Sequence, residues 1–197
     1  MRRITRILIA ILATSFSASA MAVPIVVADL GALDGNTSAS GTLSENGLHW
    51  YSFSVDGFTY LDIATTAASI DTEIGLYDAA GNLVGNDDDN GVGLLSALSF
   101  GTGSGLLLGD SFNLGGDGIA NGENGALAAG LYYLVVGEFN VTFNATGFDV
   151  VSSGPDIGGT YDLSIFTDAA SVAVSEPGTL ALFGLGLFGM AARRRKA

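Results

Sequence analysis

Hydrophobic and polar positions alternate in short runs along the middle of the chain. In residues 48–55, LHWYSFSV, the side chains of His49, Tyr51, Phe53 and Val55 fall on one face, which is the period of two typical of a strand. The run FTYLDIAT follows, and the Asp-Gly pair between the two runs indicates a hairpin. Further strand-like runs occupy residues 72–78, 82–85, 94–100, 131–139, 147–151 and 159–166.

Turn residues separate these runs at regular intervals, for example Asn90-Gly91 and Gly154-Pro155. No segment between the two ends of the chain shows a convincing helical period of 3.6 residues. Short strands with regular turns predict an all-β, antiparallel β-sandwich. We expect residues 23–168 to form one domain, because a chain of about 146 residues can bury roughly two thirds of its unfolded surface.

The sequence predicts a glycine-rich insertion in this domain at residues 101–126. Nine of its residues are glycine. Glycine disfavours regular elements because it loses the most backbone entropy on ordering, so we expect a long surface loop.

The first 22 residues have the pattern of a secretory signal peptide. Three arginines precede an apolar stretch, residues 7–13, and small residues follow it. This order predicts export and removal by signal peptidase near residue 22. An uncleaved N-terminal anchor is the alternative, and the short apolar stretch disfavours it.

The other end of the chain predicts a hydrophobic helix after a linker at residues 169–174. Residues 178–192 are apolar and stop at Arg193. Such a helix is about 22 Å long, short of the roughly 30 Å of membrane hydrocarbon. Ser175 and Glu176 suit its N-terminal cap and Pro177 its first turn. The positive-inside rule keeps the arginines cytoplasmic and the body beyond the inner membrane.

Charge is segregated along the chain. All twenty Asp and Glu lie within residues 7–192, and all seven Lys and Arg lie outside that interval. Nucleic acid and anionic lipid are therefore poor partners of the body, because phosphate binding needs cationic side chains, whereas dissolved cations are suitable ones. The absence of cysteine excludes disulfides, thiolate zinc sites and a cysteine nucleophile.

The C-terminal segment resembles a known sorting signal. Glu176-Pro177, a glycine-interrupted apolar run and the cluster Arg193, Arg194 and Arg195 occur in the order of the PEP-CTERM signal of Gram-negative bacteria. Ser175 stands where that family usually has proline. The resemblance implies recognition of residues 175–197 by an exosortase-type membrane enzyme, transient contact with the inner membrane, and delivery of the body to the cell surface or an extracellular polysaccharide matrix. An ordinary tail anchor is the alternative.

The body is similar to the bacterial pre-peptidase C-terminal domain family. The similarity rests on DTEIGLYDAAGNLVGNDDD, LSALSF, LAAGLYYLVV and GGTYDLSIF, which occur in this order between about residues 34 and 166. It implies a jelly-roll-like β-sandwich that acts as a non-catalytic accessory module.

The densest charge on the chain is the stretch GNDDDNG, residues 85–91. Its neighbouring aspartates repel one another, and a hard cation with oxygen ligands would relieve that repulsion. The spacing resembles half of an EF-hand, but Ala97 stands where a bidentate glutamate is needed. A simpler Ca²⁺ site, if the family fold brings two turns together, would draw on Asp71, Asp78, Asp87 and Asp88. A solvated acidic turn is the alternative.

The sequence offers little for catalysis, and we predict that the body is not an enzyme. The single histidine, His49, lies in a predicted strand, where a half-buried structural role is the default. A carbohydrate-active enzyme would need a carboxylate pair across a cleft, such as Glu73 with Glu138. A carbohydrate-binding module would need exposed rings, for which the candidates are Trp50, Tyr51, Tyr60 and Tyr133.

Overall fold

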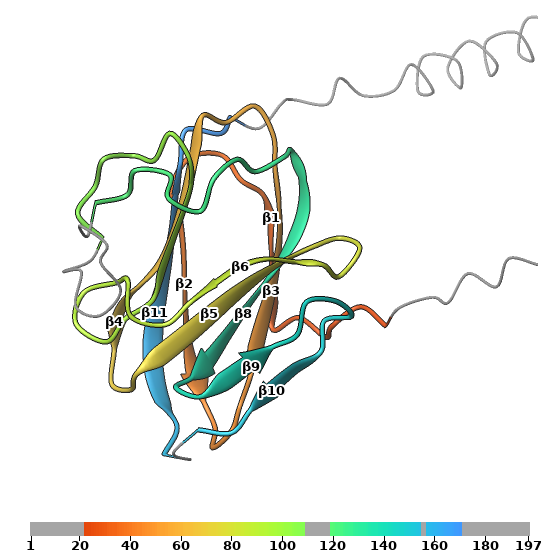
Figure 1. Ribbon diagram of the computed structural model, residues 1–197, viewed down its shortest axis with the longest axis vertical. Helices are drawn as coiled ribbons and strands as arrows, with labels where there is room; N and C mark the ends of the chain where they lie inside the picture. The colour runs from red at the N-terminus through yellow and green to blue at the C-terminus, as the bar shows by residue number, and fades with distance from the viewer. Residues whose placement is uncertain (1–21, 109–118, 155–156, 171–197) are drawn as a thin grey trace, which may run out of the picture.

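The protein is all-β throughout the part that the computed structural model describes, residues 22–108, 119–154 and 157–170. The strands run in two layers, with a short hairpin in front of one of them (Figure 1). They are β1 (Ala28–Ala32), β2 (Thr37–Leu43), β3 (His49–Val55), β4 (Tyr60–Ala68), β5 (Thr72–Asp78), β6 (Leu83–Asp87), β7 (Ala97–Gly101), β8 (Gly130–Glu138), β9 (Val141–Phe143), β10 (Val150–Ser152) and β11 (Gly159–Thr167).

Two main sheets form the sandwich. The first has the order β1-β3-β8-β5-β6, the second the order β2-β11-β4-β7, and β9 and β10 form a separate two-stranded hairpin. All pairings are antiparallel except that of β1 with β3, which is parallel. The predicted all-β, predominantly antiparallel sandwich is confirmed.

The main core lies between the two sheets and follows from the alternation along the strands. Tyr51, Phe53 and Val55 of β3 share one face, as predicted; that face points inward, and the three side chains are at most 2 % exposed. The facing strands supply the rest of the core, including Leu61, Ile63, Ile74, Leu76, Leu134, Leu163 and Ile165. Burial of alternate residues on both sheets is the physical reason why a period of two predicts this architecture.

A second hydrophobic cluster covers the outer face of the first sheet. Trp50, Tyr77 and Tyr133 point to that face and pack against Phe148, which lies between β9 and β10. Gly75 allows the close approach, because a Cβ atom there would lie 2.5 Å from the ring of Phe143. The β9–β10 hairpin thus shields one sheet face from water.

The predicted hairpin between residues 48–55 and 58–65 is wrong. Gly57 has the positive φ of a tight turn, 59°, but β3 and β4 belong to different sheets and do not pair. Two consecutive strands alternate in the same way whether they pair in one hairpin or lie in the two facing sheets of a sandwich. The hydrophobic pattern therefore did not distinguish the two arrangements. Strands β1, β2 and β9 were not predicted. The sequences of β1 and β2 consist mostly of small or hydroxylated residues, and β9 has only three residues.

Both ends of the chain lie largely outside the described residues, and with them the predicted signal peptide, residues 1–22, and the hydrophobic helix at residues 175–197. Within the described residues, no helix is long and apolar enough to span a membrane. Of the insertion, residues 101–108 and 119–126 are described. Apart from Gly101, the last residue of β7, they belong to no strand of the two sheets. Main-chain hydrogen bonds hold them, such as the one that Gly105 N donates to Ala120 O at 2.8 Å.

Candidate metal centre

Three aspartates meet where β5 begins and β6 ends. The two strands pair in antiparallel fashion with Ile74 opposite Asp87, so the residue before β5 lies beside the loop after β6. One carboxylate oxygen from each of Asp71, Asp88 and Asp89 lies within 4.8 Å of the others. Two oxygens bound to one Ca²⁺ lie at most about 5 Å apart, because each is 2.3–2.6 Å from the ion. The group therefore has the dimensions of a Ca²⁺ site.

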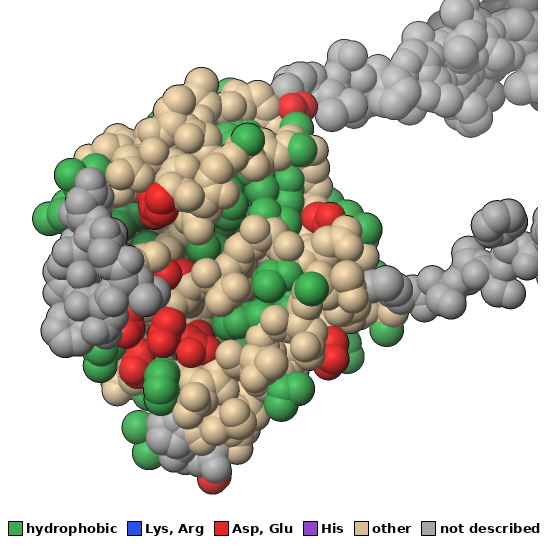
Figure 2. All heavy atoms as spheres, viewed as in Figure 1, with side chains coloured by type: hydrophobic (Ala, Val, Ile, Leu, Met, Phe, Trp, Pro, Cys, Tyr) green, Lys and Arg blue, Asp and Glu red, His purple; other side chains and the backbone are tan. Residues whose placement is uncertain are grey.

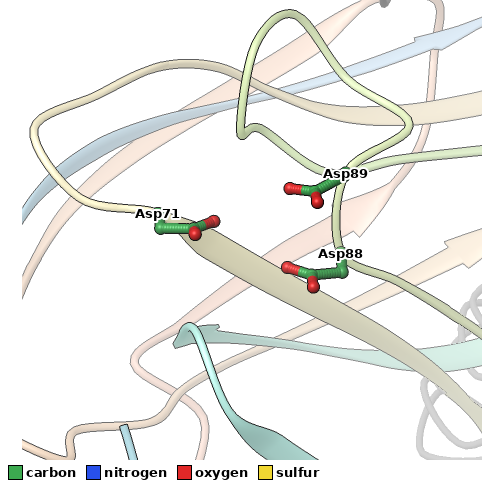
Figure 3. A group of neighbouring side chains, drawn as sticks. All are labelled: Asp71, Asp88 and Asp89. Carbon is green, nitrogen blue, oxygen red and sulfur yellow. The ribbon is translucent and has the colours of Figure 1, made fainter. Parts of the chain in front are cut away.

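The three carboxylates are oriented toward a common space. In Figure 3 the side chains of Asp88 and Asp89 point across the gap toward Asp71. Acidic side chains gather on the left of Figure 2, beside the start of β5 in Figure 1. All three aspartates are half-buried, and the Oδ1 atoms of Asp71 and Asp88 have no hydrogen-bond partner. These oxygens are free to bind a cation.

Glu138, the last residue of β8, contributes a buried carboxylate beside this group. It is 1 % exposed; its Oε2 accepts a hydrogen bond from Gly158 N at 3.2 Å, and its Oε1 has no partner. Its negative charge is one of those that raise the pKa of Asp71. A buried carboxylate oxygen without a donor is costly unless a cation or a proton compensates it.

The electrostatics of the group favour a positive ion. Burial, followed by the negative charges of Asp88, Asp89 and Glu138, raises the pKa of Asp71 to about 6. Burial, followed by the charge of Asp89, raises the pKa of Asp88 to about 6. Glu73 lies nearby, and burial raises its pKa to about 7, although the Val141 N–H donates to it and opposes that shift. No lysine or arginine occurs in residues 7–192 to balance these charges.

Two of the four predicted ligands lie in this group and two do not. Asp71 and Asp88 are brought together. Asp87 points into the sandwich, where its Oδ2 accepts hydrogen bonds from Ala97 N at 2.7 Å and Asn90 N at 3.0 Å, so it holds the loop in place. Asp78 lies at the other end of β5, where its carboxylate accepts hydrogen bonds from residues 80 and 82.

Asp89 belongs to the group and Glu138 lies beside it, and neither was among the predicted ligands. In the sequence, Asp89 cannot be told apart from its neighbours Asp87 and Asp88, and only the course of the loop after β6 places its carboxylate in the group. Glu138 enters through the pairing of β8 with β5, in which it lies opposite Thr72, sixty-odd residues away in sequence. A long-range register of this kind leaves no local signal in the sequence.

The alternative candidates occupy different environments. Glu73 lies opposite Gly137 and Glu138 opposite Thr72 in adjacent positions of the register, so the two glutamates point to opposite faces of the sheet. They do not face one another across a cleft. His49 is half-buried, as predicted, with Nδ1 2.8 Å from the Tyr161 hydroxyl, and burial lowers its pKa. Of the four candidate stacking rings, Trp50, Tyr51 and Tyr133 are buried.

Comparison with known proteins adds a family match at the C-terminus. Residues 173–196 match the model of the PEP-CTERM protein-sorting motif, which confirms the sequence-based resemblance. The motif indicates export across the inner membrane and sorting by an exosortase to the surface or the extracellular space. The chain is thus an exosortase-sorted exported protein with a β-sandwich body. No curated protein matches it.

Two solved structures resemble the body at low identity. One is the pre-peptidase C-terminal domain of a collagenase from Bacillus anthracis, with 18 % identity and a TM-score of 0.42 over 72 % of this chain and 97 % of that one. It is a domain of the family that the sequence resembles. The other is PliG of Aeromonas hydrophila, a periplasmic inhibitor of g-type lysozyme, with 9 % identity and a TM-score of 0.39 over 71 % of this chain and 98 % of that one.

Proposed function

We propose that the body is a non-catalytic surface or matrix component that binds and is stabilised by Ca²⁺. The observation that carries the proposal is the convergence of Asp71, Asp88 and Asp89 within 4.8 Å. The unpartnered Oε1 of Glu138 supports it from the adjacent strand. Because the ion would join the loop after β6 to the start of β5, beside the end of β8, its binding would fix one end of the sandwich.

The place to which the protein is sorted supports a stabilising ion. Extracellular calcium modules work with dissociation constants of about 10⁻⁴–10⁻³ M, so a site of few ligands is sufficient there. The sorting motif delivers the body to such an environment. In an extracellular polysaccharide matrix, a rigid and strongly acidic module without lysine or arginine is suited to a structural role.

Thermal unfolding of the exported chain, with Ca²⁺ and with a chelator, tests the metal site. Ca²⁺ at a hundredfold over its dissociation constant should add about 2.7 kcal/mol to the free energy of unfolding. Asp71→Asn should remove this gain. Asp162→Asn, which changes an exposed aspartate of β11, should retain it. Equal melting temperatures with and without Ca²⁺ in the unsubstituted chain would disprove the site.

The processing of the chain is tested separately. We propose that the released body begins near Val23 and lacks the sorting segment from about residue 175. Intact-mass measurement of the protein recovered outside the cells should show both ends removed. Recovery of that species with residues 175–197 still attached would contradict removal of the tail. In that case Glu176→Ala should leave the release of the protein unchanged.

A further inference from the structure

In the part of the chain that the structure describes, the two main sheets end in four edge strands, and three of these are protected. An open edge presents unpaired N–H and C=O groups, which proteins usually blunt with a bulge, a charge or a cover. The edge of β7 is covered by the insertion, through Asn124 N to Ser99 O at 2.9 Å and Gly101 N to Gly125 O at 2.8 Å. The edge of β6 is covered where Leu83 N donates to Ala145 O at 3.0 Å.

The edge of β1 is irregular and charged. Its pairing with β3 shifts register between Asp29 and Ala32, and Gly31 has a φ of 72°. The carboxylate of Asp29 lies on the same strand and accepts a hydrogen bond from Ser52. A bulged strand with a carboxylate is a poor template for pairing.

Strand β2 is different. Its seven residues, TSASGTL, contain no charge and no proline, and they pair with β11 without a shift of register. No described segment pairs with its other side, where it ends the sheet (Figure 1). Among the described edges it is the long, regular, uncharged and uncovered one.

Neighbouring contacts show which groups point outward from β2. The main chain of Thr160 bonds Ser69 on the β4 side of β11. Because the direction of the N–H and C=O groups alternates along a strand, those of Tyr161 and Leu163 point toward β2. Gly41 and Ala39 lie opposite these two residues. The N–H and C=O groups of the intervening residues therefore point away from the sheet; these residues are Ser38, Ser40 and Thr42.

We propose that β2 pairs with β2 of a second copy of this chain, antiparallel about a two-fold axis at Ser40. This pairing places Ser40 opposite its own copy and Ser38 opposite Thr42. Each such pair exchanges two main-chain hydrogen bonds through the outward groups. An isologous contact needs a surface that is complementary to itself. Residues 38–42 meet that need, because Ser38 and Thr42 are both hydroxylated and Ala39 and Gly41 are both small.

Charge favours this edge for a partner that carries the same acidic body. Strand β2 carries no charge, and the residue opposite Ser40 on the neighbouring strand β11 is Asp162. Across the paired sheets, the two copies of Asp162 would be three strand spacings apart, about 14 Å. That exceeds the Debye length of about 8 Å at physiological ionic strength. Pairing through β1 would instead bring the carboxylates of Asp29 close together.

Single cysteines test the register directly, because the chain has no cysteine of its own. Paired residues of the hydrogen-bonded type have Cα atoms about 5.5 Å apart, within the range of a disulfide. On mild oxidation of the exported chain in chelator, Ser40→Cys should form covalent dimers at least about tenfold faster than Thr160→Cys, because pairing raises the effective concentration. Thr160 is exposed on the same face, one strand further in.

The mixed pair completes the test. Ser38→Cys and Thr42→Cys should cross-link with each other and not with themselves. In sedimentation velocity the unsubstituted chain should form a dimer, and Ser40→Pro should be monomeric, since the N–H that proline removes points away from β11. Equal cross-linking of Ser40→Cys and Thr160→Cys, or a monomer that binds only other extended peptides at this edge, would overturn the proposal. The chelator keeps this outcome independent of the Ca²⁺ site.

Discussion

The buried carboxylate of Asp62 and the carboxylates of the candidate metal centre differ in whether the fold supplies hydrogen-bond donors to their oxygens. Asp62 of β4 is fully buried, and both of its oxygens have donors: the Ser99 hydroxyl at 2.6 Å and the Ser104 N–H at 2.9 Å. Asp71 and Asp88 are only half-buried, yet each has an oxygen without a donor. Burial alone therefore does not mark a binding site. A carboxylate that the fold itself satisfies is structural, whereas a converging group with unused oxygens has capacity for a ligand.

The largest effect should come from the satisfied carboxylate. Asp62→Ala should lower the free energy of unfolding by about 3 kcal/mol, because it leaves buried donors of Ser99 and Ser104 without an acceptor. Denaturant unfolding measures this. Asp162→Ala, on the exposed face of β11, should change the value by less than about 0.5 kcal/mol. A loss at Asp62 no larger than at Asp162 would mean that the hydrogen bonds to the insertion contribute little.

In the candidate metal centre, removal of a carboxylate should have the opposite effect on stability when Ca²⁺ is absent. In chelator, Asp88→Asn should raise the stability by about 1 kcal/mol, because it removes a like charge within 4.8 Å of its neighbours. With saturating Ca²⁺ it should forgo the gain of about 2.7 kcal/mol. Melting curves under the two conditions give both values. Destabilisation in chelator would show that Asp88 holds the loop rather than an ion.

A smaller effect concerns pH in the absence of Ca²⁺. The pKa values of Asp71 and Asp88 are raised from 3.8 to about 6, and that of Glu73 from 4.5 to about 7, in each case mainly by burial. The folded state thus binds these protons more tightly than the unfolded state. This stability is present below about pH 4 and is lost as the pH rises to about 7.

The same pH series with Ca²⁺ provides the control. A bound cation stabilises the ionised carboxylates, so the decline in melting temperature between pH 4 and 7 should be reversed or abolished. A calcium-free protein whose stability rises over this interval would contradict the assignment of unsatisfied carboxylates to this end of the sandwich.

Much of the fold could be predicted from the sequence because burial on one face imposes a period of two. The strand at residues 72–78 has the same bounds in the structure. The pattern failed where side chains are small or the exposed face is hydroxylated, as in β2. It also could not assign β3 and β4 to different sheets, since inward-facing alternation is the same in both layers.

The candidate site was predictable only in part, for a related reason. Asp88 belongs to a run whose mutual repulsion is visible in the sequence, and Asp71 precedes a strong strand. Their meeting depends on the β5–β6 register, and the position of Glu138 beside them depends on the register of β5 with β8. The sequence shows local charge density, but the donors that would satisfy a particular carboxylate come from distant strands.

A last, modest effect distinguishes Asp78, a turn residue, from the residues of the candidate metal site. Its carboxylate accepts hydrogen bonds from Ala80 N at 2.9 Å and Asn82 N at 2.8 Å, and so closes the turn between β5 and β6. Asp78→Ala should cost about 1 kcal/mol through these bonds, equally with and without Ca²⁺. Asp78→Asn, which keeps an acceptor oxygen, should cost less. If Asp78→Ala instead abolished the Ca²⁺-dependent gain in melting temperature, the ion would bind at the turn, and the unsatisfied oxygens of Asp71 and Asp88 would need another explanation.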